Sequence, residues 1–344
     1  MSEIARRVVL ASRPVGEPKP DNFRLEEFPV PKAGSGEVLL RTVWLSLDPY
    51  MRGRMSDAPS YAPPVGIGQA MVAGTVCEVT QSNNPEFAVG DLVAAYAGWQ
   101  THTVSDGKGL RKIDPKAEPP AAFLGVLGMP GLTAYAGLLE IGKPQPGETV
   151  VVAAASGPVG SMVGQIAQIK GARAIGIAGG PKKCAFVKND LKFADCIDHR
   201  APDFAERLAA ACPKGIDVYF ENVGGAVFEA VLPLLNPFAR VPVCGLVSTY
   251  NATELLTSGP NRLPVLMRAV LTKRLTLRGF IVTDFAAKQP EFLREATAWL
   301  KEGKITYCED IVDGLENAPG ALIGLLKGEN FGKVVVRVAP ESKR

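Results

Sequence analysis

The sequence predicts an α/β protein in which a doubly wound parallel sheet is joined to a separate β-rich domain. Its 344 residues are enough for two ordinary domains. Two observations support this prediction. The first third of the chain holds short strand-like segments between turn residues, and from about Gly125 strands and helices alternate.

The β-rich part rests on three segments of the first third, at residues 36–48, 70–80 and 90–104. Each is rich in Val, Leu and Thr, and Gly, Pro and Asn turns separate them. Short strands of this kind predict a compact antiparallel barrel or sandwich.

The alternating part begins with a buried strand at residues 148–156 and a helix at 161–172, which has apolar residues at helical spacing. The expected continuation is strands at 173–180, 194–199, 215–223 and 239–247, with helices at 182–191, 203–212 and 226–236 between them. This order predicts a Rossmann sheet built from βαβ units. A helix at 291–304, a helix at 321–328 and a strand at 333–338 follow, and we expect this tail to fold back onto the β-rich domain.

Composition excludes several classes of protein. Apolar residues make up 47% and charged residues 21%, and 38 Lys and Arg against 35 Asp and Glu leave a net charge of +3. So small an excess gives no reason to expect a nucleic-acid or membrane partner. The sequence shows no apolar run of membrane-spanning length, and a signal peptide is not expected. The six cysteines are far apart, which favours a reducing cytoplasm over a disulfide scaffold.

A turn between the first predicted strand and helix has the spacing Ala155-x-Gly157-x-x-Gly160. Glycine lets the backbone approach a pyrophosphate, and the helix N-terminus adds N–H groups and partial positive charge. Pro158 has no N–H, so Val159 and Gly160 must supply donors. Glycines also occur in tight turns for structural reasons alone, but the position between strand and helix favours a dinucleotide site.

The second strand of this unit indicates which dinucleotide binds. It ends Ala178-Gly179-Gly180, without the carboxylate that would accept bonds from the ribose of NAD, and Lys182 and Lys183 follow. These lysines would attract a 2′-phosphate. Solvated surface lysines are the alternative, although cations do not favour a helix N-terminus. The pattern favours NADPH over NADH.

A catalytic zinc site, common in two-domain dehydrogenases, is not expected. The chain has only two histidines, His102 and His199, and no CxxC pair. His199 lies at the end of a Rossmann strand, away from the β-rich domain. Such residues cannot plausibly supply the Cys and His ligands that zinc requires.

Seven segments together carry a resemblance to a known family: 45–55 (LSLDPYMRGRM), 125–135 (GVLGMPGLTAY), 153–167 (AAASGPVGSMVGQIA), 219–225 (YFENVGG), 243–251 (VCGLVSTYN), 313–319 (DGLENAP) and 324–335 (GLLKGENFGKVV). The chain resembles the zinc-independent leukotriene/prostaglandin reductase branch of the medium-chain dehydrogenase/reductase superfamily, and within it the bacterial NADPH-dependent curcumin reductases. The resemblance implies a GroES-like substrate and catalytic domain at residues 1–125, completed by 300–344, a Rossmann NADP-binding domain at 126–299, and a homodimer.

The resemblance also implies the residues that contact NADPH. They are Gly157, Pro158, Val159, Gly160, Lys183, Asn222, Cys244, Gly245, Leu246, Val247, Ser248, Thr249, Tyr250, Phe280, Ile281, Val282 and Asn330. His199 stands where many relatives have tyrosine; it could still stack or bond near the adenosine phosphate.

The implied activity is NADPH-dependent reduction of a C=C bond conjugated to a carbonyl, as in alkenals and curcumin-like enones. Without zinc, hydrogen-bond donors must stabilise the charge that develops on the carbonyl oxygen. Tyr250 and Tyr61 are the candidate catalytic residues, whereas Tyr50, in a Pro-flanked turn, is at least as well explained by packing. Substrate specificity is assigned to residues 55–68 and 251–263. A quinone or aldehyde reductase and a non-catalytic NADPH-binding protein remain as alternatives.

Overall fold

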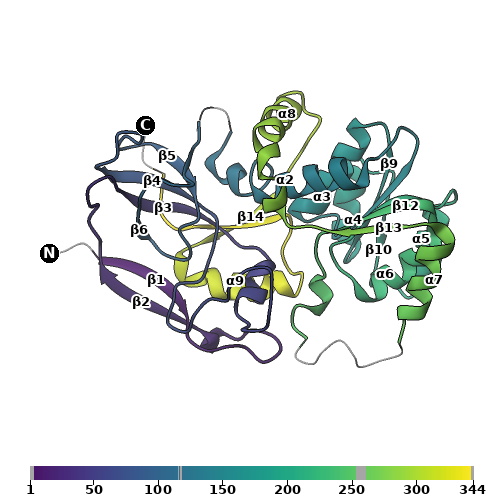
Figure 1. Cartoon of the computed structure of the whole chain (residues 1–344), viewed down its shortest axis with the longest axis horizontal. Coiled ribbons are helices and arrows are strands. Elements are labelled where there is room, and N and C mark those ends of the chain that lie inside the picture. The colour runs from purple at the N-terminus through teal and green to yellow at the C-terminus, as the bar shows by residue number, and fades with distance from the viewer. Residues whose placement is uncertain (1–3, 115, 117, 253–260, 342–344) are drawn as a thin grey trace. The chain divides into compact units, whose positions relative to one another are not determined.

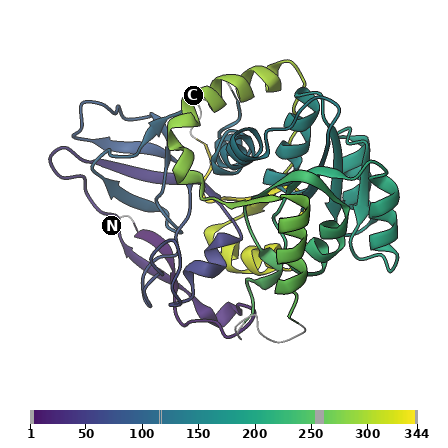
Figure 2. The same ribbon diagram turned by 45° about the vertical axis from the view of Figure 1, so that its right-hand side comes forward.

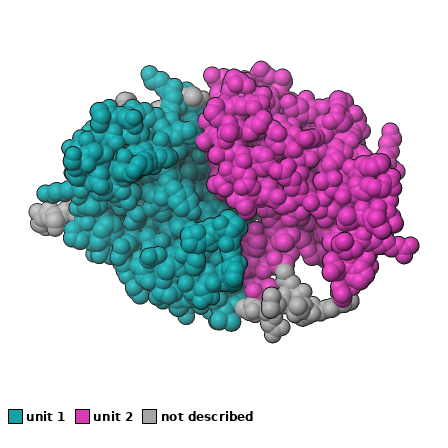
Figure 3. Space-filling view, in the orientation of Figure 1, with its two compact units in different colours: residues 1–125, 309–344 teal, residues 126–308 magenta. Residues whose placement is uncertain are grey.

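A computed structural model describes residues 4–114, 116, 118–252 and 261–341 of the chain. The described chain divides into two compact units (Figure 1, Figure 3). Unit 1 consists of residues 1–125 and 309–344, and unit 2 of residues 126–308. The second division falls between Cys308 and Glu309, so the helix that follows residue 288 belongs to unit 2.

Unit 2 contains a six-stranded parallel sheet with strand order β10-β9-β8-β11-β12-β13. The strands are β8 (Thr149–Ala153), β9 (Arg173–Ala178), β10 (Asp195–Asp198), β11 (Ile216–Phe220), β12 (Leu235–Val243) and β13 (Thr276–Gly279). The chain starts at the centre of the sheet, builds outward to β10 and then restarts from β11 on the other side of β8. This is the doubly wound Rossmann topology, and the reversal of direction between β8 and β11 leaves a crevice where such sheets bind ligands. The predicted fold class is confirmed for this unit.

Helices cover both faces of this sheet (Figure 1, Figure 2). They are α2 (Met129–Ala136), α3 (Pro158–Ile169), α4 (Pro181–Asn189), α5 (Phe204–Ala211), α6 (Gly225–Val231), α7 (Leu263–Lys273) and α8 (Gln289–Lys301), with shorter helical turns η3 (Gly137–Gly142), η4 (Leu232–Leu234), η5 (Val247–Thr249) and η6 (Val282–Lys288). Ile175 and Ile177 of β9 join a buried cluster with Leu208 of α5 and Val231 of α6. Since side chains alternate along a strand, the residues between them face the opposite layer.

Several elements of unit 2 differ from the sequence prediction. The helix expected over 226–236 ends at Val231, because Pro233 has no N–H for the helical ladder and its ring clashes with the preceding turn. The following strand therefore starts at Leu235, four residues before the predicted strand. Helix α7 and strand β13, between residues 263 and 279, were not predicted.

Unit 1 is built mainly from antiparallel strands, as expected for a GroES-like domain. Its strands are β1 (Ile4–Leu10), β2 (Phe23–Pro29), β3 (Val38–Ser46), β4 (Thr75–Ser82), β5 (Leu92–Ala95), β6 (His102–Ser105), β7 (Arg111–Lys112), β14 (Glu309–Asp313) and β15 (Lys333–Arg337). Short helices α1 (Tyr50–Arg54) and α9 (Ala318–Leu326) and turns η1 (Pro20–Asn22), η2 (Pro120–Leu124) and η7 (Leu315–Asn317) connect them. β1 and β2 pair with each other, and the other seven strands form one sheet.

The strand predicted over 90–104 is two strands, β5 and β6, separated by residues 96–101. The break has a local cause at Gly98. Its φ is +76°, and a Cβ there would lie 2.6 Å from the carbonyl oxygen of Met71. Only glycine tolerates both conditions, so the chain turns there rather than continuing as a strand. The segment 70–80 is a strand only from Thr75, and the hairpin β1–β2 was not predicted.

The C-terminal tail is tied to the N-terminal part of unit 1 in two ways. β15 pairs antiparallel with β3, with Val335 opposite Ser46. At the start of β15, Lys333 Nζ lies 2.9 Å from Asp48 Oδ1 and donates to the carbonyl of Leu47 at 2.6 Å. Both charged side chains are almost completely buried, at 3% and 6% exposed. Burial lowers the pKa of Lys333, and the Asp48 carboxylate opposes that shift.

We predict that Asp48→Ala lowers the free energy of unfolding by about 3–5 kcal/mol, because it leaves a buried ammonium without its counter-ion. Urea denaturation measures the loss. A double variant, Asp48→Leu with Lys333→Met, removes both charges and should regain much of the stability. Lys108→Ala, which breaks an exposed ion pair with Asp106, is the matched control and should leave the unfolding midpoint in place. An Asp48→Ala midpoint equal to that of the control would contradict the prediction.

Candidate cofactor-binding and active site

The predicted phosphate-binding turn lies between β8 and α3, at the point where the sheet reverses direction. Gly157 is the N-terminal cap of α3 and Pro158 is its first residue. A Cβ on Gly160 would lie 2.3 Å from the carbonyl oxygen of Ala154, so no side chain fits at that position. The turn therefore brings the main chain and the first N–H groups of a twelve-residue helix to one place, which suits an anion.

The alanine at the first motif position has a structural explanation. Ala155 is fully buried, and its main-chain N–H donates to the carbonyl of Ile177 on β9 at 2.9 Å. A Cβ on Gly176, also on β9, would lie 2.8 Å from the Ala155 methyl group. The glycine missing from the turn is thus matched by a glycine on the neighbouring strand, which leaves room for the methyl group.

At the end of β9, several predicted residues come together. Gly180 has a φ of +91° and donates its N–H to Asp198 Oδ1 at 2.9 Å. A Cβ on Gly179 would lie 3.0 Å from His199 Nε2. Lys183 lies in the first turn of α4, which begins just after Gly180, and its charge contributes to the lowered pKa of His199, after the larger effects of burial and Arg200. The structure therefore places Lys183 and His199 at one corner beside the Gly179-Gly180 turn.

A second cationic residue at this corner, Arg200, was not predicted from the sequence. Its Nε would lie 3.0 Å from a Cβ on Gly179, and its main-chain N–H shares the Asp198 carboxylate with Gly180. Burial and the charge of Arg200 lower the pKa of His199, which keeps the imidazole neutral at neutral pH. The signal was present in the sequence, since Arg200 follows the third strand as Lys182 and Lys183 follow the second.

A buried glutamate, Glu221, organises the loops after β11 and β12. One carboxylate oxygen accepts the N–H groups of Val223 and Gly224 at 2.6 and 2.8 Å and the hydroxyl of Tyr219 at 3.0 Å. Its main-chain carbonyl accepts the N–H of Cys244 at 2.9 Å. Burial raises the pKa of Glu221 although these donors oppose the shift. Glu221 is part of the segment 219–225 that carries the family resemblance, but no role was predicted for it.

Eight of the predicted contact residues lie on these loops, Asn222 after β11 and residues 244–250 after β12. Asn222 donates its amide to the carbonyl of Ala153 at 2.8 Å, which places it at the end of β8, beside the phosphate-binding turn. Cys244 follows β12, and burial raises its thiol pKa to about 12. Ser248 donates its hydroxyl to the carbonyl of Val223 at 2.5 Å. The segments after β8, β11 and β12 are thus bonded to each other at the carboxyl end of the sheet.

Tyr250, the first candidate catalytic residue, lies just after the turn η5 and is half-buried. Its hydroxyl oxygen would lie 3.1 Å from a Cβ on Gly245, so the ring folds back over the loop that follows β12. The absence of a side chain at Gly245 creates the room for this phenol. Tyr250 is therefore held beside Asn222 and Cys244, the other predicted residues of this edge.

Phe280 and Asn330 differ from the rest of the predicted set. Phe280 is 7% exposed, and its ring packs edge-on against Phe220 with centroids 6.2 Å apart. Its side chain is a core residue, so a cofactor contact there must come from the main chain or from the half-buried Ile281 and Val282. Asn330 belongs to unit 1, where its amide donates to the carbonyl of Gly332 at 2.8 Å.

Tyr61, the second candidate catalytic residue, also belongs to unit 1 and is 63% exposed. It lies close enough to Tyr50 to affect that phenol electrostatically, and Tyr50 places its hydroxyl 3.2 Å from that of Tyr96. Burial raises the pKa of Tyr50. Unit 1 thus gathers three tyrosines, of which sequence analysis did not single out Tyr96. Of the two predicted specificity segments, 55–68 is described, whereas residues 253–260 lie outside the described part.

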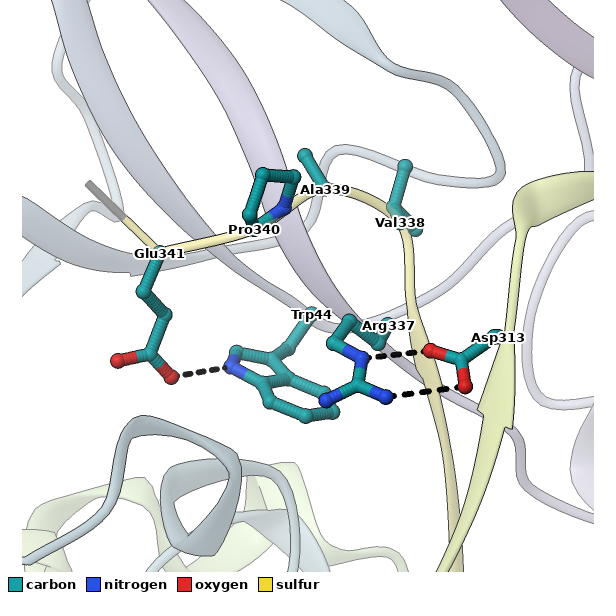
Figure 4. Close-up of a pocket in the computed structure, with 7 residues that line it drawn as sticks. All are labelled: Trp44, Asp313, Arg337, Val338, Ala339, Pro340 and Glu341. Carbon is teal, nitrogen blue, oxygen red and sulfur yellow. Dashed lines mark hydrogen bonds and ion pairs between the residues drawn. The ribbon is translucent and has the colours of Figure 1, made fainter. Parts of the chain in front are cut away.

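No group of three or more His, Cys, Asp or Glu side chains that could hold a metal ion occurs within the described ranges. His102, on β6, places its Nδ1 3.1 Å from the hydroxyl of Thr101. A cavity of about 450 Å³ lies elsewhere in unit 1 and is lined by Trp44, Asp313, Arg337 and residues 338–341 (Figure 4). Arg337 and Asp313 form a two-bond ion pair there, and Trp44 donates to Glu341 at 2.9 Å (Figure 4). None of the predicted site residues lines this cavity.

Comparison with known proteins gives the family. The model of the N-terminal domain of oxidoreductase matches residues 6–113, and that of zinc-binding dehydrogenase matches residues 158–302. The NADPH-dependent curcumin reductase of Escherichia coli (strain K12) is 62% identical to the chain over 335 residues, covering 97% of each protein. The chain belongs to the zinc-independent reductase branch of the medium-chain dehydrogenase/reductase superfamily.

Other members of this branch are similar to the chain over nearly its whole length. Prostaglandin reductase 1 of Sus scrofa is 42% identical over 328 residues, which cover 94% of this chain and 96% of the relative. The crystal structure of CurA from Vibrio vulnificus in complex with NADPH superposes with a TM-score of 0.94 at 58% identity, covering 97% of this chain and 99% of that one. The resemblance predicted from the sequence motifs is confirmed.

Proposed function

We propose that this reductase uses NADPH to reduce C=C bonds conjugated to a carbonyl group, in α,β-unsaturated ketones and aldehydes that include curcumin-like enones. The observation that carries the proposal is the basic corner of Lys183, His199 and Arg200 beside a turn that suits a pyrophosphate. The relatives support the substrate class, since curcumin itself is a conjugated enone and a curcumin reductase covers nearly the whole chain.

The residues of unit 2 fit the dinucleotide. Residues 157–160 would hold the pyrophosphate, because Gly160 excludes a side chain and the N-terminus of α3 supplies donors. Lys183 and Arg200 would pair with the 2′-phosphate. Asn222 and residues 244–250 would line the nicotinamide end, with Ile281 and Val282 and, from unit 1, Asn330 as further contacts. When bound, NADPH supplies the hydride.

Two tyrosines are proposed as the polar side chains that contact the substrate. As the β-carbon gains a hydride, negative charge develops on the carbonyl oxygen, and a hydrogen-bond donor there lowers the barrier. Tyr250 is proposed as that donor, since it lies at the carboxyl end of the sheet and its phenol carries an O–H group that can donate. Tyr61 is proposed to contact the substrate from unit 1, which we assign as the substrate domain, while unit 2 binds the cofactor.

The proposal is tested by measuring NADPH consumption with a panel of enones and alkenals, including curcumin, against quinones and saturated aldehydes. Turnover on the conjugated substrates, with reduction of the C=C bond seen by mass spectrometry of the product, is the expected result. Faster turnover of quinones or aldehydes would assign one of those activities instead. NADPH binding without turnover of any of them would indicate a non-catalytic NADPH-binding protein.

We also propose that the protein acts in the cytoplasm, where NADPH and reduced thiols are maintained. All six cysteines are free thiols. None of the helices in the described ranges is long and apolar enough to cross a bilayer. Fractionation of cells that express the protein tests this location, and recovery with the membrane fraction would overturn it.

The first prediction from this site concerns cofactor choice. Lys183→Ala should weaken NADPH binding by about 1–3 kcal/mol and leave NADH binding nearly unchanged, because a charge-assisted bond to phosphate is lost. Arg200→Ala should act in the same direction. Lys182→Ala, which changes an exposed lysine on the same helix, is the comparison variant and should weaken NADPH binding much less than Lys183→Ala. Fluorescence titration with both dinucleotides measures the effect; equal losses for NADPH and NADH would remove these residues from the 2′-phosphate site.

The second concerns Tyr250. Removing one donor to a developing oxyanion typically costs about 2.7–4 kcal/mol of transition-state stabilisation. Tyr250→Phe should therefore lower kcat on an enone by about 10²–10³-fold, with the NADPH affinity and the unfolding midpoint close to those of the parent protein. Tyr96→Phe is the control for loss of a phenol outside this loop. A Tyr250→Phe variant with the parent kcat would leave Tyr250 as a packing residue.

The third concerns assembly: we propose a homodimer formed through the outer edge of the parallel sheet. In the described ranges β13 pairs only with β12, and the adjacent helix α7 exposes Val265, Met267 and Leu271 at 55%, 57% and 76%. An open strand edge beside apolar side chains is a self-association surface. Leu271→Glu should shift the sedimentation-equilibrium mass from dimer to monomer, whereas Val15→Glu, at an 84% exposed position of unit 1, should not. A monomeric parent protein would contradict the proposal.

A further inference from the structure

Two thiols of unit 2, those of Cys184 and Cys196, lie next to each other near the basic corner. Cys184 is the fourth residue of α4 and Cys196 the second residue of β10, and their side chains are within hydrogen-bonding distance of each other. Both are partly exposed rather than sealed in the core. The Cys184 thiol also faces the carbonyl oxygen of Ala178, at 4.0 Å.

The strand register places the two cysteines on the same face independently of that contact. Cys196 is the register partner of Gly176 on β9, so both point to one side of the sheet. A Cβ on Gly176 would lie 2.8 Å from Val187 of α4 and 3.1 Å from the Cys196 sulfur, so that side is the one that α4 covers. Cys184 is three residues before Val187 and therefore lies on the same side of the helix.

The pKa values of the two thiols are shifted in opposite directions, which suits a pair in which one thiol is oxidised first and the other then attacks it. The hydrogen bond from Cys196 lowers the pKa of Cys184, against the opposing effects of burial, Asp198 and Asp195. The pKa of Cys196 is raised by that same contact and by burial. Burial raises the pKa of Cys77 and of Cys212 to about 11. The pKa of Cys184 is thus lowered, whereas those of Cys77, Cys196 and Cys212 are raised, so Cys184 is the member of the pair that reacts as a thiolate and Cys196 is placed to resolve it.

We propose that Cys184 and Cys196 form an oxidation site that closes to a reversible disulfide in the presence of a peroxide. The Cys184 thiolate attacks one peroxide oxygen and becomes a sulfenic acid, while the other oxygen leaves as hydroxide and takes up a proton. The Cys196 sulfur then attacks the Cys184 sulfur and loses its proton, and a second water leaves. Two thiols and one hydrogen peroxide give one disulfide and two waters, and a dithiol reductant reverses the change.

The oxidation site is coupled to the cofactor corner through α4, a statement that rests on the proposed NADPH function. Lys183 precedes Cys184 directly, and the Ala178 carbonyl that faces the thiol also accepts the N–H of His199 at 3.1 Å. A disulfide bond is shorter than a hydrogen-bonded contact between two thiols, so closing it draws the first turn of α4 toward β10. That movement displaces Lys183 from the Gly179-Gly180 turn. The disulfide therefore weakens NADPH binding, and by linkage bound NADPH slows disulfide formation.

The first experiment follows the chemistry without the cofactor. The full chain is treated with hydrogen peroxide, its free thiols are blocked, and it is digested with trypsin without reduction. The expected product joins the peptides 184–188 and 193–200, at a mass two hydrogens below their sum. Cys184→Ser and Cys196→Ser should each abolish it, and Cys308→Ser, which changes a cysteine outside the pair, should retain it. Failure to form this species, or formation of another disulfide in preference to it, overturns the proposal.

The second experiment measures the coupling. The oxidised protein should bind NADPH about tenfold more weakly than the reduced protein, and a dithiol reductant should restore the affinity. The Cys184→Ser variant should show no such change on peroxide treatment. An unchanged affinity in protein shown to carry the disulfide would overturn the coupling. Absence of NADPH binding by the reduced parent protein would instead contradict the proposed function and leave the disulfide result standing.

Discussion

Glu221 accepts hydrogen bonds at both its side chain and its main chain, and the edge of unit 2 that carries the candidate site depends on them. Its carboxylate accepts the N–H groups of Val223 and Gly224, just before α6. Its main-chain carbonyl accepts the N–H of Cys244, just after β12. A carboxylate with 2% exposure would be expensive to bury without these donors. These hydrogen bonds fix the positions of Asn222 and Cys244. Glu221 is therefore a positioning residue for the predicted cofactor contacts and is not itself a predicted contact.

The same edge shows how the Rossmann turn tolerates departures from its usual sequence. Ala154 adopts a φ of +53°, a conformation that costs a non-glycine residue free energy. Its carbonyl oxygen then occupies the space that a side chain at Gly160 would need. Ala155 adds a methyl group, which Gly176 accommodates from the next strand. The requirement for small residues is thus a property of the packed strand pair, and only part of it is visible in the linear motif.

This difference explains which features could be predicted from the sequence. Strand and helix alternation and the glycine spacing are local patterns, and they predicted the parallel sheet and the turn before α3. The break at Gly98 and the early end of α6 also have local causes, a positive φ and Pro233, but the apolar residues around them favoured continuous elements. α7 exposes much of its apolar surface, so it lacks the two-sided pattern that marks a surface helix. The role of Glu221 could not be predicted, because it depends on a contact with Cys244, which is 23 residues away in the sequence. The two residues come together only in the folded chain.

The basic corner illustrates how charge, strand order and helix placement combine. Placing β10 beside β9 brings His199 and Arg200 to the start of α4, although they follow a different strand from Lys183. Beside them, one carboxylate oxygen of Asp198 accepts the N–H groups of Gly180 and Arg200. A cationic side chain at the N-terminus of α4 lies at the positive end of the helix dipole, which is an unfavourable position for it. In the proposed site a 2′-phosphate would offset this unfavourable interaction, and NADH, which has no 2′-phosphate, would not. The proposed preference for NADPH would then come from the helix position of Lys183 as well as from the contacts with the phosphate.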